Sequence, residues 1–171
     1  MKGVSDEQLL KLSAKNGFYK GVEEAIKRGV DVNCNYGFDL SNTAYNGHSD
    51  IVRLLLDNGA LLKMEYNDND VLNIACEKGY LDIVKMLVEV GGDVNVNDGE
   101  PLMQASFRGY IEIVKYLLDN GANPYKSPSK PRPYSLGKVG GIYMRPIDWA
   151  EEGGHPEIVK LLRKSMDEYN N

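Results

Sequence analysis

The sequence predicts an all-α fold, a solenoid built by stacking similar pairs of short helices. The first observation is a glycine followed by an apolar pattern, which recurs with spacings of 30, 32, 30 and 45 residues at Gly17, Gly47, Gly79, Gly109 and Gly154. The second observation is a shorter apolar segment before each of these glycines. Such a period means that each unit is one supersecondary element and that neighbouring units bury a common core.

Each unit is expected to hold two helices, one on either side of its glycine. The third unit has two apolar stripes with the i, i+3, i+4 spacing of a helix face. They are Leu72, Ala75 and Cys76, then Ile83, Val84, Leu87 and Val88. Gly79 separates the two stripes, and Gly91 follows the second, where a glycine commonly ends a helix. Five such helix pairs are therefore predicted.

The expected repeats form one domain over residues 1–171 and span residues 5–33, 34–64, 65–95, 96–123 and 145–169. In the first repeat, Ser5 followed by Gln8 predicts a capping box that opens the first helix. In the last repeat, the helix that begins near Pro156 carries Lys160 and Arg163, so its outer side should face water.

The regular spacing is interrupted once, by residues 123–145. The segment from Asn123 to Pro146 holds five of the seven prolines, and residues 123–147 contain five bases and no acid. The net charge of the whole chain is −5, so the remainder of the chain carries −10. Because the repeats on both sides are intact, we interpret this segment as an insertion in one inter-repeat connection.

Composition and motifs argue against several classes of protein. No apolar run reaches the roughly 18 residues of a membrane span, and the N-terminus lacks a signal-peptide stretch. Cys34 and Cys76 form no C-x-x-C pair, and the histidines have no nearby ligand set. The S-x-x-K pattern at 127–130 lies among prolines that disfavour the helix such chemistry needs. We expect a cytoplasmic, monomeric protein that is not an enzyme and holds no cofactor or metal.

At this point the sequence resembles the ankyrin repeat family. The family pattern T-P-L-H-x-A-A-x-x-G-H-x-E-I-V-x-x-L-L-x-x-G-A is matched by "EPLMQASFRGYIEIVKYLLDNGA" at 100–122 and by "RPIDWAEEGGHPEIVKLL" at 145–162. The resemblance implies a curved stack of helix pairs with short β-hairpin "fingers" between repeats. Most repeats here are near 30 residues rather than the family's 33, as in ankyrin proteins of large DNA viruses. Only the finger at 123–145 is long.

The resemblance implies a non-catalytic scaffold that binds a partner protein through its fingers and the concave face of its first helices. His48 and His155, directly after the repeat glycine, are expected to bond neighbouring backbone. The candidate partner-binding residues are aromatic or basic side chains on these surfaces: Tyr36, Phe38, Tyr45, Tyr66, Lys78, Phe107, Arg108, Tyr125, Lys130, Arg132, Tyr134 and Tyr143. For Tyr45 and Phe107 the alternative is packing against the adjacent finger, and for the aromatics of the short fingers it is packing onto the helices.

The long finger and the function each leave alternatives open. The finger is either a tolerated loop without function or a recognition arm whose bases attract an acidic surface. If the origin is viral, the partner would be a host protein. The alternative function is nucleic-acid binding through the basic finger 123–145, or inhibition by mimicking nucleic acid. The mimic would use carboxylates of the second helices, namely Asp50, Asp57, Asp82, Glu89, Glu112 and Asp119. The acidic body argues against direct nucleic-acid binding.

Overall fold

The computed structural model describes residues 4–62, 70–127 and 144–169. The chain divides into two compact units, Met1–Gly92 and Asp93–Asn171, and each is described by itself. Within the described residues the regular secondary structure consists of ten α-helices, which follow one another in pairs, and includes no strand. This confirms the predicted all-α repeat fold. The expectation of one domain over residues 1–171 stays a prediction.

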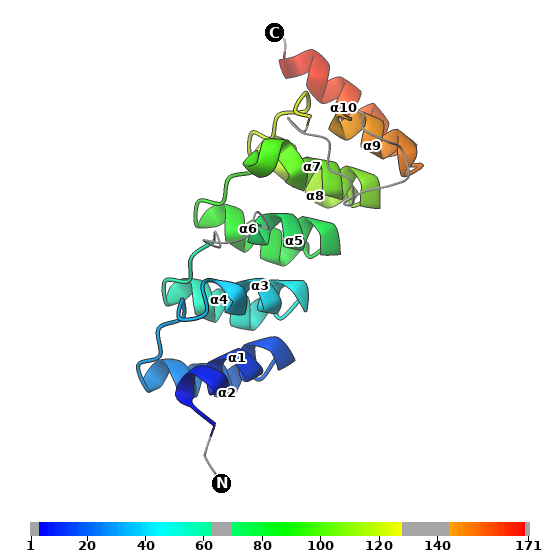
Figure 1. Cartoon of the computed structure of the whole chain (residues 1–171). Coiled ribbons are helices and arrows are strands. Elements are labelled where there is room, and N and C mark those ends of the chain that lie inside the picture. The colour runs from blue at the N-terminus through cyan, green and yellow to red at the C-terminus, as the bar shows by residue number, and fades with distance from the viewer. Residues whose placement is uncertain (1–3, 63–69, 128–143, 170–171) are drawn as a thin grey trace. The chain divides into compact units, whose positions relative to one another are not determined.

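The first unit contains three helix pairs, shown from blue to green in Figure 1. Their helices are α1 (Asp6–Asn16), α2 (Tyr19–Lys27), α3 (Phe38–Tyr45), α4 (Ser49–Asp57), α5 (Val71–Lys78) and α6 (Leu81–Glu89). First helices pack on first helices, as α1 on α3 and α3 on α5, and second helices pack likewise, as α2 on α4 and α4 on α6. The pairs therefore form a two-layered stack.

The second unit contains two helix pairs. Its helices are α7 (Val96–Arg108), α8 (Ile111–Asp119), α9 (Pro146–Glu152) and α10 (Pro156–Tyr169). Helix α7 packs on α8 and α9, and α10 packs on α9 and α8, so the two pairs stack as in the first unit. Asn97, Asp98 and Gly99 have left-handed backbone angles inside α7, which separates its first residues from the regular helix that follows.

The core consists of side chains that occupy the same place in successive repeats. In the first four repeats, the first helix buries a leucine seven residues before the repeat glycine, and the second helix buries a valine five residues after it. The leucines are Leu10, Leu40, Leu72 and Leu102, and the valines are Val22, Val52, Val84 and Val114, all 0 or 1% exposed. Burying one such side chain contributes about 1.5–3 kcal/mol. Small residues three before the glycine, such as Ala14 and Ala44, let the first helices approach closely.

The ring directly after three of the repeat glycines packs against the glycine of the preceding repeat. A Cβ added to Gly17 would lie 2.8 Å from Cε1 of His48, and one added to Gly47 would lie 2.7 Å from Cζ of Tyr80. In the second unit His155 covers Gly109 in the same way, and its Nε2–H donates to the carbonyl oxygen of Phe107 at 2.9 Å. His48 Nε2 lies 3.4 Å from the Lys15 carbonyl oxygen. The predicted backbone role of both histidines is confirmed.

The described fingers are turns rather than the β-hairpins that the resemblance implied, because about ten residues leave no length for paired strands. An asparagine closes each turn against the next repeat. Asn33 Nδ2 donates to the Gly59 carbonyl at 2.9 Å, and its Oδ1 accepts from the Leu61 N–H at 2.9 Å. Asn95 does the same with the Gly121 carbonyl at 3.0 Å and the Asn123 N–H at 2.8 Å. The retained D-V-N segments therefore link consecutive repeats.

Several helices end in an Asn–Gly sequence whose asparagine is held by its own helix. The side-chain Nδ2 donates to the carbonyl oxygen four residues earlier, at 2.7 or 2.8 Å, in Asn16, Asn46, Asn58 and Asn120. At Asn46 and Asn120 the same carbonyl also accepts the backbone N–H of the asparagine at 3.1 Å, so the side chain adds a second bond to the last turn of its own helix.

One buried carboxylate, Asp39 at the start of α3, gives the first unit a predicted dependence on pH. Its side chain is 1% exposed, Oδ2 accepts from Asn35 Nδ2 at 2.7 Å, and Oδ1 has no hydrogen-bond partner in the part of the chain that is described. Burial raises the pKa of Asp39 above its ordinary value of 3.8, although the Asn35 bond and the charge of Lys11 lower it. The folded state therefore holds this proton more tightly than the unfolded state, and stability falls as pH rises from the ordinary value through the raised one.

Asp39→Asn is expected to increase the free energy of unfolding at neutral pH, because it removes a buried charge and keeps an oxygen that can accept from Asn35. The gain should vanish in acid below the ordinary pKa, where Asp39 is protonated in both states. Urea unfolding followed by circular dichroism, repeated over a pH series, measures this. Asp57→Asn on the exposed side of α4 is the control and should give no such gain. A difference between Asp39→Asn and wild type that does not change with pH would contradict the prediction.

Candidate partner-binding surface

The first unit exposes an aromatic stripe along helix α3. Phe38, Asn42 and Tyr45 stand at i, i+4 and i+7, so they lie on one side of the helix. We call these three residues the α3 face. Phe38 is 46% exposed and Tyr45 is 52% exposed, although both are large apolar side chains. Tyr36, in the turn just before α3, is also exposed and has a left-handed backbone.

A cation from the next repeat lies on this stripe. The Nζ atom of Lys78, at the end of α5, lies 4.1 Å from the centre of the Tyr45 ring and 3.4 Å from a carboxylate oxygen of Glu77. Burial lowers the pKa of Lys78, but the bond to Tyr45 and the charge of Glu77 outweigh it, and the pKa is raised. Lys78 is therefore held in its charged form over the ring, and the surface combines apolar area with a positive charge.

In the second unit the equivalent aromatic is packed against its neighbour. Phe107 occupies the place of Tyr45, two residues before the repeat glycine, but its ring meets Trp149 of α9 edge-on at a centroid distance of 5.7 Å. The guanidinium of Arg108 lies 5.9 Å from the Phe107 ring, and Arg108 itself is exposed. Phe107 thus packs on a helix of the following repeat rather than against its adjacent finger, which was the expected alternative to partner binding.

Two polar side-chain atoms on the first helices of the second unit are buried. Gln104 Oε1 on α7 and Trp149 Nε1 on α9 have no hydrogen-bond partner within the described ranges. Both residues stand five positions before a repeat glycine, the place that Asn42 holds in the α3 face. Apart from the finger residues, the candidates predicted from the sequence stand one or two positions before a repeat glycine, so they do not include this row. The sequence does contain a signal for this row. When the repeats are aligned on their glycines, Gln104 and Trp149 fall at the same position.

Tyr125 takes part in holding the last helix. Its hydroxyl donates to the carbonyl oxygen of Met166 at 2.8 Å, and its ring lies 6.0 Å from that of Tyr169. Its N–H donates to Oδ1 of Asn123 at 2.9 Å, as the N–H of Asn95 does with Asp93 two residues before it. Tyr125 therefore replaces the linking asparagine of the earlier fingers, and its contacts support a structural role beside the predicted binding role.

The remaining predicted site residues cannot be placed. Tyr66, Lys130, Arg132, Tyr134 and Tyr143 lie outside the described residues, as does most of the long finger. Among the residues that are described, no three histidine, cysteine or acidic side chains gather as a metal site would require. None of the described helices has both the length and the apolar character that a membrane span needs.

Comparison with known proteins agrees with this architecture. Residues 10–98, and residues 40–128 in an overlapping match, fit the family model of ankyrin repeats in three copies. A stretch of 76 residues is 34% identical to the ankyrin repeat and KH domain-containing protein mask-1 of Caenorhabditis elegans, over 42% of this chain and 3% of that protein. The similarity is therefore to a small part of a much longer protein. Because the family model covers well over half of a chain that folds into stacked helix pairs, this protein belongs to the ankyrin repeat family.

Proposed function

We propose that this chain is a non-catalytic scaffold that binds a partner protein through the exposed side of its first helices and its fingers. Ankyrin repeats are generally protein–protein interaction modules, and the family is typically non-catalytic. The observation that carries the proposal is the α3 face, where two aromatic side chains about half exposed lie in one row beside the charge of Lys78. Large aromatics that become buried on association supply most of the affinity of many interfaces.

The α3 face favours an extended segment of the partner. Phe38 and Tyr45 are seven residues apart in α3, which corresponds to about 10 Å at 1.5 Å per residue. A partner segment in the extended polyproline II conformation advances about 3.1 Å per residue with three residues per turn, so side chains three residues apart lie on one side and would meet both rings. A carboxylate or carbonyl oxygen near the second ring would meet Lys78. We therefore propose a partner segment with apolar side chains and an acidic group next to one of them.

The binding experiment uses the chain as bait for affinity capture, with Phe38→Ala/Tyr45→Ala compared with wild type. Removing both rings deletes the largest exposed apolar area of the α3 face, and we expect at least a tenfold loss in affinity for the captured partner, or about 1.4 kcal/mol. Isothermal titration calorimetry with the identified partner measures the loss. Tyr19→Ala, an exposed aromatic on α2, is the matched control and should bind as wild type does.

Equal binding by Phe38→Ala/Tyr45→Ala and wild type would remove the α3 face from the proposal. The same titration, with residues 128–142 replaced by a short turn, measures what the long finger adds as a proposed specificity element. The resemblance of the short repeats to ankyrin proteins of large DNA viruses supports a further proposal, that the partner is a protein of a host cell whose activity the chain modulates. Affinity capture from candidate host cells tests that part separately.

A further inference from the structure

The ring that follows the first repeat glycine does not make the contact with another glycine that the corresponding rings of later repeats make. Phe18 follows Gly17 directly and so holds the place of His48, Tyr80 and His155, each of which packs against a preceding glycine. Phe18 is 65% exposed. Leu12 of α1 holds the place of Trp149, which packs against the preceding repeat through Phe107, and Leu12 is 53% exposed. We call Leu12 and Phe18 the N-terminal face.

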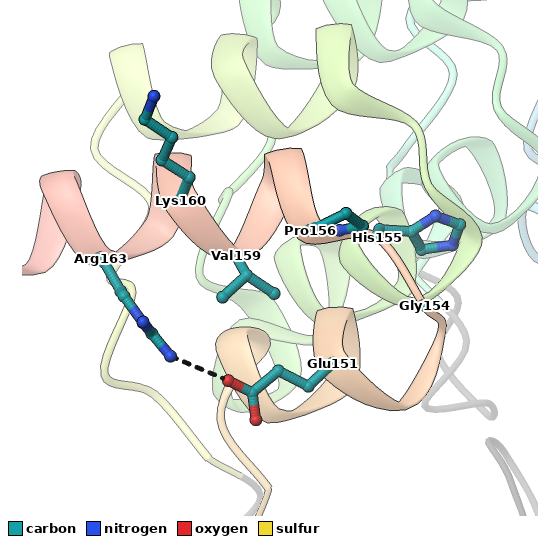
Figure 2. A pocket seen from close by; sticks show the side chains of 7 residues that line it. All are labelled: Glu151, Gly154, His155, Pro156, Val159, Lys160 and Arg163. Atoms are coloured by element: carbon teal, nitrogen blue, oxygen red, sulfur yellow. Dashed lines mark hydrogen bonds and ion pairs between the residues drawn. The ribbon is translucent and has the colours of Figure 1, made fainter.

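The last repeat has the complementary surface. Gly154 is its repeat glycine, and a Cβ added there would have nothing within 4 Å, whereas Gly17, Gly47 and Gly109 are each covered by a ring. Val159 holds the place of four valines that are 0% exposed, yet it is itself partly exposed. An open hollow of about 520 Å³ lies here, lined by Gly154, Pro156 and Val159 among others. We call these three residues the C-terminal face (Figure 2).

We propose that the chain associates head to tail, with the N-terminal face of one copy on the C-terminal face of a second copy. Phe18 would cover Gly154 of the second copy in the same way that His155 covers Gly109. A second copy fits because this chain carries both the uncovered ring and the uncovered glycine of the contact that joins repeats. A head-to-tail contact uses a different face of each copy, so a dimer keeps one free face of each kind and association continues beyond it, into an open chain or a larger ring. These surfaces are separate from the α3 face, and this inference goes beyond the proposed scaffold function.

An ion pair across the C-terminal face weakens this association. Arg163 donates to a carboxylate oxygen of Glu151 at 3.2 Å, and the dashed line in Figure 2 passes beside Val159. Glu151 holds the place of Ala14 and Ala44, small side chains that are fully buried by the next repeat. When a second copy docks, these two side chains must therefore change rotamer or lose their hydration, and either change costs free energy. We therefore expect association only at high protein concentration. At low concentration the protein should be the monomer that the sequence analysis expects.

The test is sedimentation velocity over a concentration series, using the full chain and two single variants. The average mass of wild type should rise beyond that of a dimer. Phe18→Ser and Val159→Glu each leave one face intact, so each should stay monomeric alone, and their mixture should form a dimer and nothing larger. A wild type that stays monomeric throughout would overturn the proposal. So would Val159→Glu that associates as well as wild type, because that result would indicate contact between two N-terminal faces.

A second variant shows whether the ion pair opposes association. Glu151→Ala with Arg163→Leu restores the side chains that Ala44 and Leu56 supply at the same places in the second repeat, and it should lower the dissociation constant at least tenfold. An unchanged or higher dissociation constant would contradict the proposed geometry. Circular dichroism and urea midpoints equal to those of wild type establish that Phe18→Ser and Val159→Glu are folded, as expected for positions that are not buried.

Discussion

Gly109→Ala is expected to lower the free energy of unfolding by about 1.5–3.5 kcal/mol. Gly109 has φ of +83°, a left-handed conformation that costs a residue with a Cβ about 1–2 kcal/mol. The new Cβ would also lie 2.5 Å from Cε1 of His155, so the ring must move. Its 2.9 Å hydrogen bond to the Phe107 carbonyl is then strained or lost, which costs about 0.5–1.5 kcal/mol more.

Gly121→Ala is the matched control for this effect. Gly121 has φ of +86°, but a Cβ added there would have no neighbour within 4 Å. The substitution should therefore cost only the backbone term of about 1–2 kcal/mol. Urea unfolding of both variants, with hydrogen exchange of the amides in α8 and α9, measures the difference between them. Equal losses would mean that the contact of His155 with Gly109 contributes nothing to the stacking of the last repeat.

Asn95→Ala is expected to lower the free energy of unfolding by about 2 kcal/mol. The substitution removes two hydrogen bonds at once, one from Nδ2 to the Gly121 carbonyl at 3.0 Å and one from the Asn123 N–H to Oδ1 at 2.8 Å. Each bond contributes about 0.5–1.5 kcal/mol, and the two backbone groups would lose their partner. Because these bonds link the finger before α7 to the end of α8, the loss should appear in the amide protection of both segments.

Asn120→Ala is the control for Asn95→Ala. Asn120 is exposed, and its Nδ2 donates at 2.8 Å to the Tyr116 carbonyl of its own helix. The substitution removes one local bond on a solvated helix end, and we expect a loss of about 0.5 kcal/mol or less. A loss from Asn95→Ala no larger than this would show that the linking asparagines fix only the shape of the turn.

The helices could be predicted from the sequence because their signals are local. Ser5 and Gln8 form the predicted capping box, with Gln8 N–H donating to Ser5 Oγ at 3.2 Å and Ser5 N–H donating to Gln8 Oε1 at 3.1 Å. The glycine register also predicted the buried stripes of the third repeat, since Leu72, Ile83 and Leu87 are buried. In both cases, residues a few positions apart determine the structure.

The contacts of the candidate site depend on distances between repeats, and the sequence does not contain these directly. Nothing near Phe107 in sequence indicates that Trp149 would pack on it across 42 positions, or that Lys78 would lie over Tyr45. The left-handed Asn97 and Asp98 were also not foreseen, because the pattern around them fits an ordinary turn. These features follow from how one repeat is placed on the next, and local patterns carry little information on that placement.

The Asn–Gly helix ends have a consequence for the chemical ageing of the protein. Asparagine before glycine deamidates when the glycine nitrogen attacks the side-chain carbonyl carbon, ammonia leaves, and water opens the resulting succinimide ring to aspartate or isoaspartate. In Asn58–Gly59 and Asn120–Gly121 the side-chain nitrogen is bonded to the helix, and the glycine N–H donates to the carbonyl of Leu56 or Leu118 at 3.0 Å. While the repeats are stacked, the side-chain amide and the glycine N–H are thus both held in other hydrogen bonds. The rate at which isoaspartate accumulates would then report how often these helix ends open.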